Sequence, residues 1–488
     1  MEKQEKIPNI IAIIGAIVLL VLAVVGLSYA FFSAFIKNGE TDPSIEGTGA
    51  NLSLVYTDGK SVITSSNIMP GWSATKTFTV TNNGEADTYY KLNISSITNE
   101  FVDGGLTFSI ASADGGTSVA EQAVGTTTRT ISPSITIAEG ATHTYTVTAK
   151  YINLNTDQTP DLGKSFSYTI GIEASQKPTF KDIILANNEV KTPITTPGAA
   201  VSTSSEALLA SAEDDYGTSY YFRGAVTNNY VEFANKCWRI VRIGGDNTVK
   251  LILHNDNISN ASNPCSSANN STTAAFVHYD GNIYKSEFNS NYNDNAYVGF
   301  MYGTPGSTTY EATHANTNKS TILTNLETWY NNNLKTYESV IDNNVFCNDK
   351  SLSSGSGYSA NATDYAARER LYTSKIPSLK CNGELSKITS KIGLITADEL
   401  AFAGYAVRGY ITTSYLKENA TGYSWWSLSP AGFYNKSLSY VFRVRSDNDA
   451  IDICNVNVDS SVRPVISLVS SITISGVSET SEDPYVVK

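Results

Sequence analysis

The chain has 488 residues, of which 41% are hydrophobic and 10% aromatic, and this composition argues against an intrinsically disordered protein. Its 34 basic and 46 acidic residues give a net charge of −12, which argues against a nucleic-acid partner because phosphate binding requires a basic surface. Only 16% of the residues are charged. A surface rich in Ser, Thr, Asn and Tyr is typical of exported β-rich proteins, and at roughly 100–200 residues per domain the length predicts two or three domains.

An apolar segment near the N-terminus indicates the compartment. Residues 1–9 carry two lysines and are expected to be cytoplasmic, while residues 10–36 are apolar apart from two serines and a tyrosine. A run of this length spans a bilayer, and lysines in front of it keep the N-terminus inside. We therefore expect a single-pass membrane anchor at 10–36, with the bulk of the chain extracellular. Ser28 and Ala30 are also spaced for cleavage after Ala30, so a removed signal peptide stays open as an alternative.

Residues 45–175 show apolar residues alternating with polar ones at a period of two. The alternation occurs in short runs at 52–54, 78–80, 90–94, 106–110, 145–149 and 166–172, and Asn-Gly, Asp-Gly and Gly-Gly pairs separate them. This pattern predicts antiparallel strands with one buried face, and the fold class expected here is an all-β sandwich. The string TNNGEAD at 81–87 lies between two of the runs and predicts a hairpin.

Residues 176–212 lose this periodicity and are rich in Pro, Thr, Ser and Ala. They predict an extended linker, with a short helix at 205–212 and another at 181–190 that belongs to the next unit. After the linker we expect an α+β head domain at 213–470 and a C-terminal tail at 471–488.

The head opens with a clear hairpin signal. The strand-like runs Cys237–Ile243 and Val249–His254 are joined through Gly-Gly-Asp-Asn. Apolar residues at a spacing of three and four predict a helix within 320–341, and Thr396 with Glu399 forms a capping box for another helix. Strand-like runs return before 470, which together predicts an α+β layout.

The five cysteines fit an exported protein. A disulfide between Cys347 and Cys381, which flank a polar loop, is favoured and is expected to contribute about 3–4 kcal/mol. The pairing of Cys237, Cys265 and Cys454 stays open, and the odd count leaves one thiol unpaired within the chain. The absence of a C-x-x-C string argues against zinc or thioredoxin-like chemistry.

The first exported region resembles a family of secreted β-proteins. The string SYAFFSA at 28–34 and the stretch NIMPGWSATKTFTVTNNGEADTYYKLNI at 67–94 are similar to the TasA/camelysin group. This resemblance implies an exported β-sandwich and, through the fibre-forming TasA proteins, assembly into fibres. The protease activity associated with camelysin is not expected, because no catalytic pattern accompanies the resemblance.

The second region resembles a domain of surface proteins from Firmicutes and their wall-less relatives. The resemblance rests on GTSYYFRG, NYVEFANKCWRIVRI, AYVGFMYG, GLITADELAFAG, WWSLSP and VRPVISL in that order. This domain has no established activity. Its closing WSLSP and VRPV strings are also distantly similar to C-type-lectin-like folds, which implies at most a fold and not a function.

Candidate catalytic residues are few. The histidines are predicted to be surface or strand-exposed residues without metal-ligand spacing: His143, His254, His278 and His314. Ser427 and Ser429 lie outside a G-x-S-x-G string, and no histidine follows them in the chain. We therefore expect no enzyme, and an extracellular hydrolase with an unrecognised site stays an alternative.

An acidic cluster suggests the one cofactor considered, calcium. Asp447, Asp449 and Asp452 offer carboxylate oxygens close together in the chain. A solvated hairpin turn explains the same residues, so both interpretations stay open.

The string WWSLSPAGF provides the ligand-binding candidates Trp425 and Trp426, with Tyr423 just before it. Consecutive residues of a strand face opposite sides. One tryptophan is therefore expected in the core, against the strands around Val465 and Trp238, and the other toward the loop surface.

The long loops are rich in Tyr, Asn and Ser, a composition typical of recognition surfaces. The sequence therefore predicts a membrane-anchored cell-surface protein of a Gram-positive bacterium, whose extracellular head binds a glycan or protein ligand in adhesion or recognition. A fibre or biofilm-matrix subunit of the TasA type is the structural alternative.

Overall fold

The computed structural model describes residues 33–34, 54–58, 68–84, 87–102, 104–175, 178–409, 413–472, 474–475 and 479–487. The chain divides into two compact units, Met1–Pro178 and Thr179–Lys488, and we call the second unit the head. The predicted cytoplasmic segment 1–9 lies outside the described residues, as does the predicted anchor 10–36 except for Ser33 and Ala34. In the described part of the chain, no helix is both long and apolar enough to cross a bilayer.

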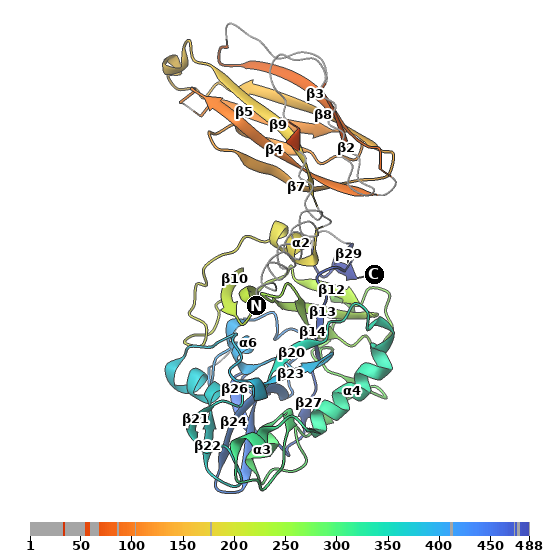
Figure 1. Cartoon of the computed structure of the whole chain (residues 1–488), viewed down its shortest axis with the longest axis vertical. Coiled ribbons are helices and arrows are strands. Elements are labelled where there is room, and N and C mark those ends of the chain that lie inside the picture. Colours follow the sequence, from red (N-terminus) through yellow and green to blue (C-terminus); the bar gives the residue numbers. More distant parts are fainter. Residues whose placement is uncertain are drawn as a thin grey trace, which may run out of the picture. The chain divides into compact units, whose positions relative to one another are not determined.

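The first unit consists of two antiparallel sheets (Figure 1). One sheet has the order β1 (Ser33–Ala34), β9 (Phe166–Ser175), β4 (Thr88–Asn99) and β7 (Arg129–Ile137). The other has the order β2 (Leu54–Asp58), β3 (Trp72–Asn82), β8 (Thr142–Tyr151), β5 (Leu106–Ser112) and β6 (Val119–Ala123). Both sheets contribute side chains to one hydrophobic core, so this unit is a β-sandwich as predicted.

The predicted alternation accounts for the core of the sandwich. In β4 the inward residues Tyr90, Leu92 and Ile94 are fully buried, and from the other sheet Phe108 and Tyr145 meet them in the same core. Burial of one such side chain is worth about 1.5–3 kcal/mol relative to exposure. The period of two therefore determines which face of each sheet is buried.

The string TNNGEAD does not form the predicted hairpin. It follows β3, which pairs with β2 and β8, and it leads into β4, which pairs with β7 and β9 in the other sheet. The residues of this string are typical of a tight turn, but the strands before and after it belong to different sheets. Local sequence specifies a change of direction, and only packing decides which strands become neighbours.

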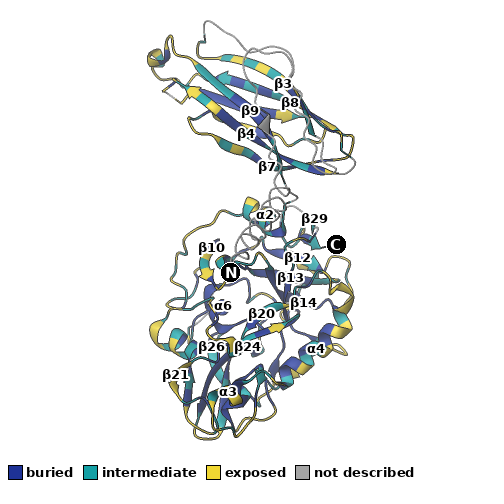
Figure 2. Cartoon of the chain, in the orientation of Figure 1, coloured by how far each residue is buried: buried dark blue, intermediate teal, exposed yellow. Residues whose placement is uncertain are grey.

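The head is built on two larger sheets. The eight-stranded sheet contains β10 (Ala207–Asp214), β11 (Gly217–Gly224), β12 (Tyr230–Phe233), β13 (Lys236–Ile243), β14 (Val249–Asn255), β28 (Val465–Leu468), β29 (Ile474–Ser475) and β30 (Tyr485–Val487). The seven-stranded sheet contains β17 (Lys285–Ser286), β21 (Leu352–Gly355), β22 (Thr363–Tyr365), β24 (Trp425–Tyr434), β25 (Leu438–Val444), β26 (Ile451–Asn455) and β27 (Ser460–Ser461). Buried side chains of both sheets belong to one hydrophobic core, shown as dark blue strands in Figure 2.

Shorter elements surround these sheets. Three two-stranded ribbons pair β15 (His278–Tyr279) with β16 (Asn282–Ile283), β18 (Met301–Tyr302) with β19 (Asn318–Lys319), and β20 (Asn344–Cys347) with β23 (Lys387–Ser390). The α-helices of the described head are α2 (Phe180–Asn187), α3 (Tyr310–His314), α4 (Thr321–Asn333), α5 (Ala366–Arg368) and α6 (Ala397–Phe402). More of the described residues lie in strands than in helices, so the head is more β-rich than the predicted α+β layout suggests.

The local predictions for the head are confirmed in three places. The hairpin of β13 and β14 forms with Trp238 opposite Leu253. Helix α4 lies within the predicted helical stretch and buries Trp329 against the core. Helix α6 begins with the predicted capping box between Thr396 and Glu399.

The region predicted as a linker, 176–212, instead belongs largely to the head. Helix α2 buries Phe180 and Ile184, and the segment predicted as a helix at 205–212 forms strand β10. The residues predicted as a tail at 471–488 are also part of the head, because β30 pairs with β12 and Tyr485 is fully buried. Its ring packs edge-on against Phe180 at a centroid distance of 5.1 Å.

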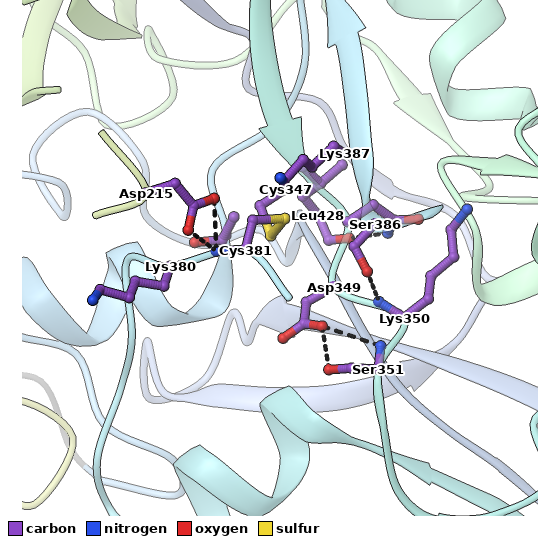
Figure 3. The surroundings of a disulfide bond; sticks show 12 residues. Asp215, Cys347, Asp349, Lys350, Ser351, Lys380, Cys381, Ser386, Lys387 and Leu428 are labelled. Atoms are coloured by element: carbon purple, nitrogen blue, oxygen red, sulfur yellow. Dashed lines mark hydrogen bonds between the residues drawn. A yellow bond between two sulfur atoms is a disulfide. The ribbon is translucent and has the colours of Figure 1, made fainter. Parts of the chain in front are cut away.

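Two disulfides restrain the head. One joins Cys347 and Cys381, the pair that the sequence favours, and beside it the Asp215 carboxylate accepts a hydrogen bond of 3.2 Å from the Cys381 amide (Figure 3). The other joins Cys237 and Cys265. Cys454 is a buried free thiol.

Candidate functional site

An open cleft of about 560 Å³ lies at the end of β14. Its walls come from three parts of the head that are distant in sequence: residues 255–259 with 269–274, residues 278–285 with the β15–β16 ribbon, and Tyr423 just before β24. Seven of its fifteen lining residues are Asn, Ser or Thr, and Asp256 is the one carboxylate among them. The cleft is therefore lined mainly by neutral hydrogen-bonding groups.

Asparagine side chains shape the first wall. The Asn255 amide donates to the carbonyls of Pro264 and Asn269 at 3.0 Å each, so it holds both ends of the loop that follows β14. The Asn257 amide donates to the carbonyls of Asn235 at 2.8 Å and Ala261 at 3.0 Å. Because an asparagine side chain can both donate and accept, it organises an irregular backbone without secondary structure.

The Asp256 carboxylate, which lines the cleft, joins two elements of the head. Lys236 Nζ contacts Asp256 Oδ1 at 2.7 Å, and the His278 backbone amide donates to Asp256 Oδ2 at 2.9 Å. The ring Nδ1 of His278 lies 3.7 Å from the same Oδ2. The carboxylate is therefore already occupied by partners from β13 and β15, and its role is to join these elements.

Several polar groups at the cleft are left for a ligand. Within the described chain, the hydroxyls of Ser259, Ser271 and Thr273 have no protein hydrogen-bond partner, and these residues line the cleft. The Tyr423 ring is partly exposed and lies edge-on to Phe276 at 6.2 Å, while Lys285 Nζ lies 5.1 Å from its centroid. Unpaired hydroxyls around a fixed aromatic ring provide both directional and stacking contacts.

The predicted ligand-binding residues separate into two groups. Tyr423 lines the cleft, whereas Trp425 and Trp426 are both fully buried. The Trp426 indole donates to the Ser286 carbonyl at 2.7 Å and packs against Phe288. The expectation that one tryptophan reaches the loop surface is wrong, because β24 runs through the centre of its sheet and is covered on both faces.

The acidic cluster proposed for calcium is instead paired with basic side chains of the chain itself. Arg445 contacts both Asp447 and Asp452, and Lys417 contacts Asp449 at 3.0 Å. In the described residues no group of His, Cys, Asp and Glu is arranged to hold a metal. The geometry therefore favours the alternative interpretation, a charged turn between β25 and β26.

Three of the four histidines predicted to be exposed are buried. His143, His254 and His314 are buried residues, and the side chain of His278 is only 7% exposed. His143 Nδ1 lies 2.7 Å from the Tyr90 hydroxyl in the sandwich core. Burial lowers the pKa of His314 to about 3 and, with the help of nearby arginines, that of His254 well below its usual range. Ser427 and Ser429 are also buried, as structural residues of β24.

A second recess of about 30 Å³ lies near the Cys347–Cys381 disulfide, and ion pairs within the chain surround it. Basic and acidic side chains in and beside it pair with one another: Arg242 with Asp214 and Glu399, Lys250 with Glu399, and Arg370 with Asp349 and Asp398. Burial by itself raises the pKa of Glu399, but Lys250 and Arg242 outweigh burial and lower it to about 2. Among the charged side chains that line this recess in the described chain, Lys380 is the one without an ion pair.

Sequence reasoning identified one residue of the cleft, Tyr423, and noted the Asn-rich loops without selecting residues from them. Asn255 and Asn257 follow directly after the predicted strand Val249–His254, where polar residues turn the chain. This position is the sequence signal for the two residues. The partners that complete the cleft come from 278–285 and 423, and no local pattern connects these segments.

No protein-family model matches the chain, and no curated protein is significantly similar to it.

Proposed function

We propose that this chain is a cell-surface binding protein whose head recognises a neutral saccharide in the cleft beside β14. The observation that carries the proposal is the lining itself, in which Asn, Ser and Thr side chains share one cleft with the Tyr423 ring. The two disulfides indicate an extracellular or otherwise oxidising location, which supports the surface assignment. The proposal includes anchoring of the protein in the membrane through residues 10–36.

The chemistry of the lining supports a sugar over a charged ligand. A saccharide presents many hydroxyls that each donate and accept, which matches the free hydroxyls of Ser259, Ser271 and Thr273. Its apolar ring face packs on an aromatic side chain, the role assigned to Tyr423. The lining offers a charged ligand few counter-charges, because Asp256 already pairs with Lys236 and the exposed Lys285 is the one lysine or arginine among the lining residues.

The same lining argues against glycoside hydrolysis at this cleft. Hydrolysis of a glycosidic bond commonly uses two carboxyl groups on either side of the bond. The described lining contains one, Asp256, and no hydrogen bond joins the His278 ring to a serine or cysteine of the described chain. The proposed event is binding without turnover.

A glycan array probed with the purified full chain tests the proposal. We expect binding to a defined set of neutral glycans and a loss of about 5–30-fold in affinity for Tyr423→Ala, since a stacked aromatic contributes about 1–2 kcal/mol. Tyr292→Ala is the matched control, because Tyr292 is also partly exposed at 39% but does not line the cleft. Binding that is unaffected by Tyr423→Ala, or no binding to any glycan, would contradict the proposal.

A further inference from the structure

A group of buried polar side chains lies behind the cleft, in the core of the head. It consists of Arg463, His254, Tyr415 and Trp425, which we call the Arg463 cluster. Each residue is at most 2% exposed. The cluster takes no part in the cleft described above, and its composition is unusual because it contains a buried cation without an acidic side chain.

Arg463 is held by backbone groups only. Its Nε donates to the Leu253 carbonyl at 2.8 Å, and its Nη1 donates to the Leu416 carbonyl at 2.6 Å. The other two fully buried arginines of the head each contact a carboxylate, Arg223 with Glu206 and Arg239 with Glu418. Among the described residues, Arg463 has no such ion pair.

Four hydrogen-bond donors of the cluster have no acceptor in the described chain. They are Arg463 Nη2, Trp425 Nε1, the Tyr415 hydroxyl and His254 Nδ1. The Asn419 amide nitrogen, which can only donate, lies 3.2 Å from His254 Nε2 and also donates to the His254 carbonyl and to Asn270 Oδ1. We assign the ring proton of His254 to Nδ1, the tautomer in which Nε2 is an acceptor, so all four groups are donors.

Arg463 connects the segments that carry the other three donors. Arg463 binds the carbonyls of the residue before His254 and of the residue after Tyr415. Its guanidinium carbon lies 5.2 Å from the Trp425 ring centroid. The chain thus brings β14, the 413–424 loop and the start of β24 together at this point.

The cluster carries an uncompensated positive charge. Burial lowers the pKa of Arg463 to about 10, which leaves the guanidinium protonated at neutral pH. Tyr405 and Tyr415 keep their protons because burial raises their pKa, and Glu418 is engaged by Arg239. A buried charge is costly unless it is paired, and buried donors are rarely left without acceptors.

We propose that the Arg463 cluster binds a small monovalent anion, chloride under ordinary conditions, which accepts hydrogen bonds from the four donors and neutralises Arg463. A buried water molecule satisfies donors but does not neutralise the charge. A monatomic halide also needs the least room in a packed interior. The anion is a structural component of the head, independent of the saccharide cleft.

Bromide provides the direct test, because it replaces chloride and scatters anomalously. Crystals of the full chain soaked in sodium bromide are expected to show an anomalous peak within hydrogen-bonding distance of Arg463 Nη2. In solution at constant ionic strength, replacing gluconate by chloride is expected to raise Tm by roughly 2–4 °C per tenfold increase in chloride. Solvent density without an anomalous peak, or a Tm that depends on ionic strength alone, overturns the proposal.

The two adjacent tryptophans supply matched variants. Trp425→Phe removes a donor of the cluster and keeps most of the ring, so it is expected to weaken the apparent chloride affinity by about 3–10-fold. Trp426→Phe removes an indole nitrogen that already donates to Ser286, and it is expected to leave the chloride dependence unchanged. An equal chloride dependence in both variants contradicts the assignment. Arg463→Met is expected to abolish the dependence, and the tryptophan pair decides the question if that variant does not fold.

Discussion

Cys265 is bonded to Cys237 across a Cα–Cα distance of 4.9 Å, so the loop that forms one wall of the cleft is tied to strand β13. Cys237 faces Asn255 in the β13–β14 register, and Asn255 begins the lining of the cleft. The disulfide and the Asn255 side chain therefore restrain the same loop from two sides.

This restraint predicts an effect on both stability and binding. Cys265→Ser is expected to lower the free energy of unfolding by about 3–4 kcal/mol, the chain-entropy value for a loop of this length. It is also expected to weaken glycan binding, because the loop must then be ordered by the ligand. Denaturant melts and array titrations measure the two effects.

Cys347→Ser is the control for this prediction, because its disulfide closes a loop of similar length away from the cleft lining. We expect a comparable loss of stability with unchanged glycan affinity. Equal losses of affinity in the two variants would show that the cleft responds to global stability and not to its own disulfide.

The free hydroxyls of the cleft predict a second effect on binding. Ser271→Ala and Thr273→Val each remove a group that has no protein partner, so stability is expected to change by less than about 0.5 kcal/mol. Glycan affinity is expected to fall by about 3–10-fold for each hydroxyl that the sugar contacts. Isothermal titration with a glycan found on the array measures this, and full affinity in the double variant would remove these hydroxyls from the site.

The Glu399 network predicts sensitivity to acid. Because Lys250 and Arg242 hold the pKa of Glu399 at about 2 despite burial, its stabilising contribution is complete above the unfolded value of about 4.5. That contribution, about 3 kcal/mol, is lost as the pH falls from about 4.5 to about 2. Burial lowers the pKa of Lys250, whereas the pKa of Arg242 is raised. Arg242 therefore keeps its positive charge over a wider pH range and is the more persistent ion-pair partner of Glu399.

Glu399→Gln tests this directly. The variant is expected to lose about 3–5 kcal/mol at pH 7, since it leaves Arg242 and Lys250 without their shared carboxylate. Its stability is also expected to change less steeply between about pH 4.5 and 2 than that of the wild type. Glu384→Gln, in an exposed pair with Lys387, is expected to change little. The same slope in Glu399→Gln and wild type would contradict the assignment.

The buried ring of His314 is expected to make the stability of the protein fall further at acidic pH. Its ring is buried, with Nε2 at 3.2 Å from the Tyr365 hydroxyl, and burial with nearby Lys350 lowers its pKa to about 3. Because the unfolded imidazole binds a proton near pH 6.5, His314 favours unfolding increasingly as the pH falls from about 6.5 toward 3. Proton–nitrogen NMR of the ring is expected to show a neutral imidazole at pH 5, and a protonated ring there would contradict this environment.

Local features of the chain were predictable where a single segment carries the whole signal. The alternation in β4 and β8 determines the buried face of each strand, since the side-chain period of a strand is two. The hairpin of β13 and β14 and the capping box of α6 likewise involve residues close together in sequence. The favoured disulfide between Cys347 and Cys381 follows the same logic, because the two cysteines flank one loop.

Features that depend on distant partners required the tertiary structure. Nothing in TNNGEAD says whether the next strand pairs with β3 or crosses to the other sheet. The described parts of 176–212 and 471–488 carry no local pattern, because they gain their order from contacts with other strands of the head. The adjacent tryptophans are both buried because strands from elsewhere in the chain cover both faces of β24. The cleft and the Arg463 cluster have the same origin, since each gathers residues from three segments that only long-range packing brings together.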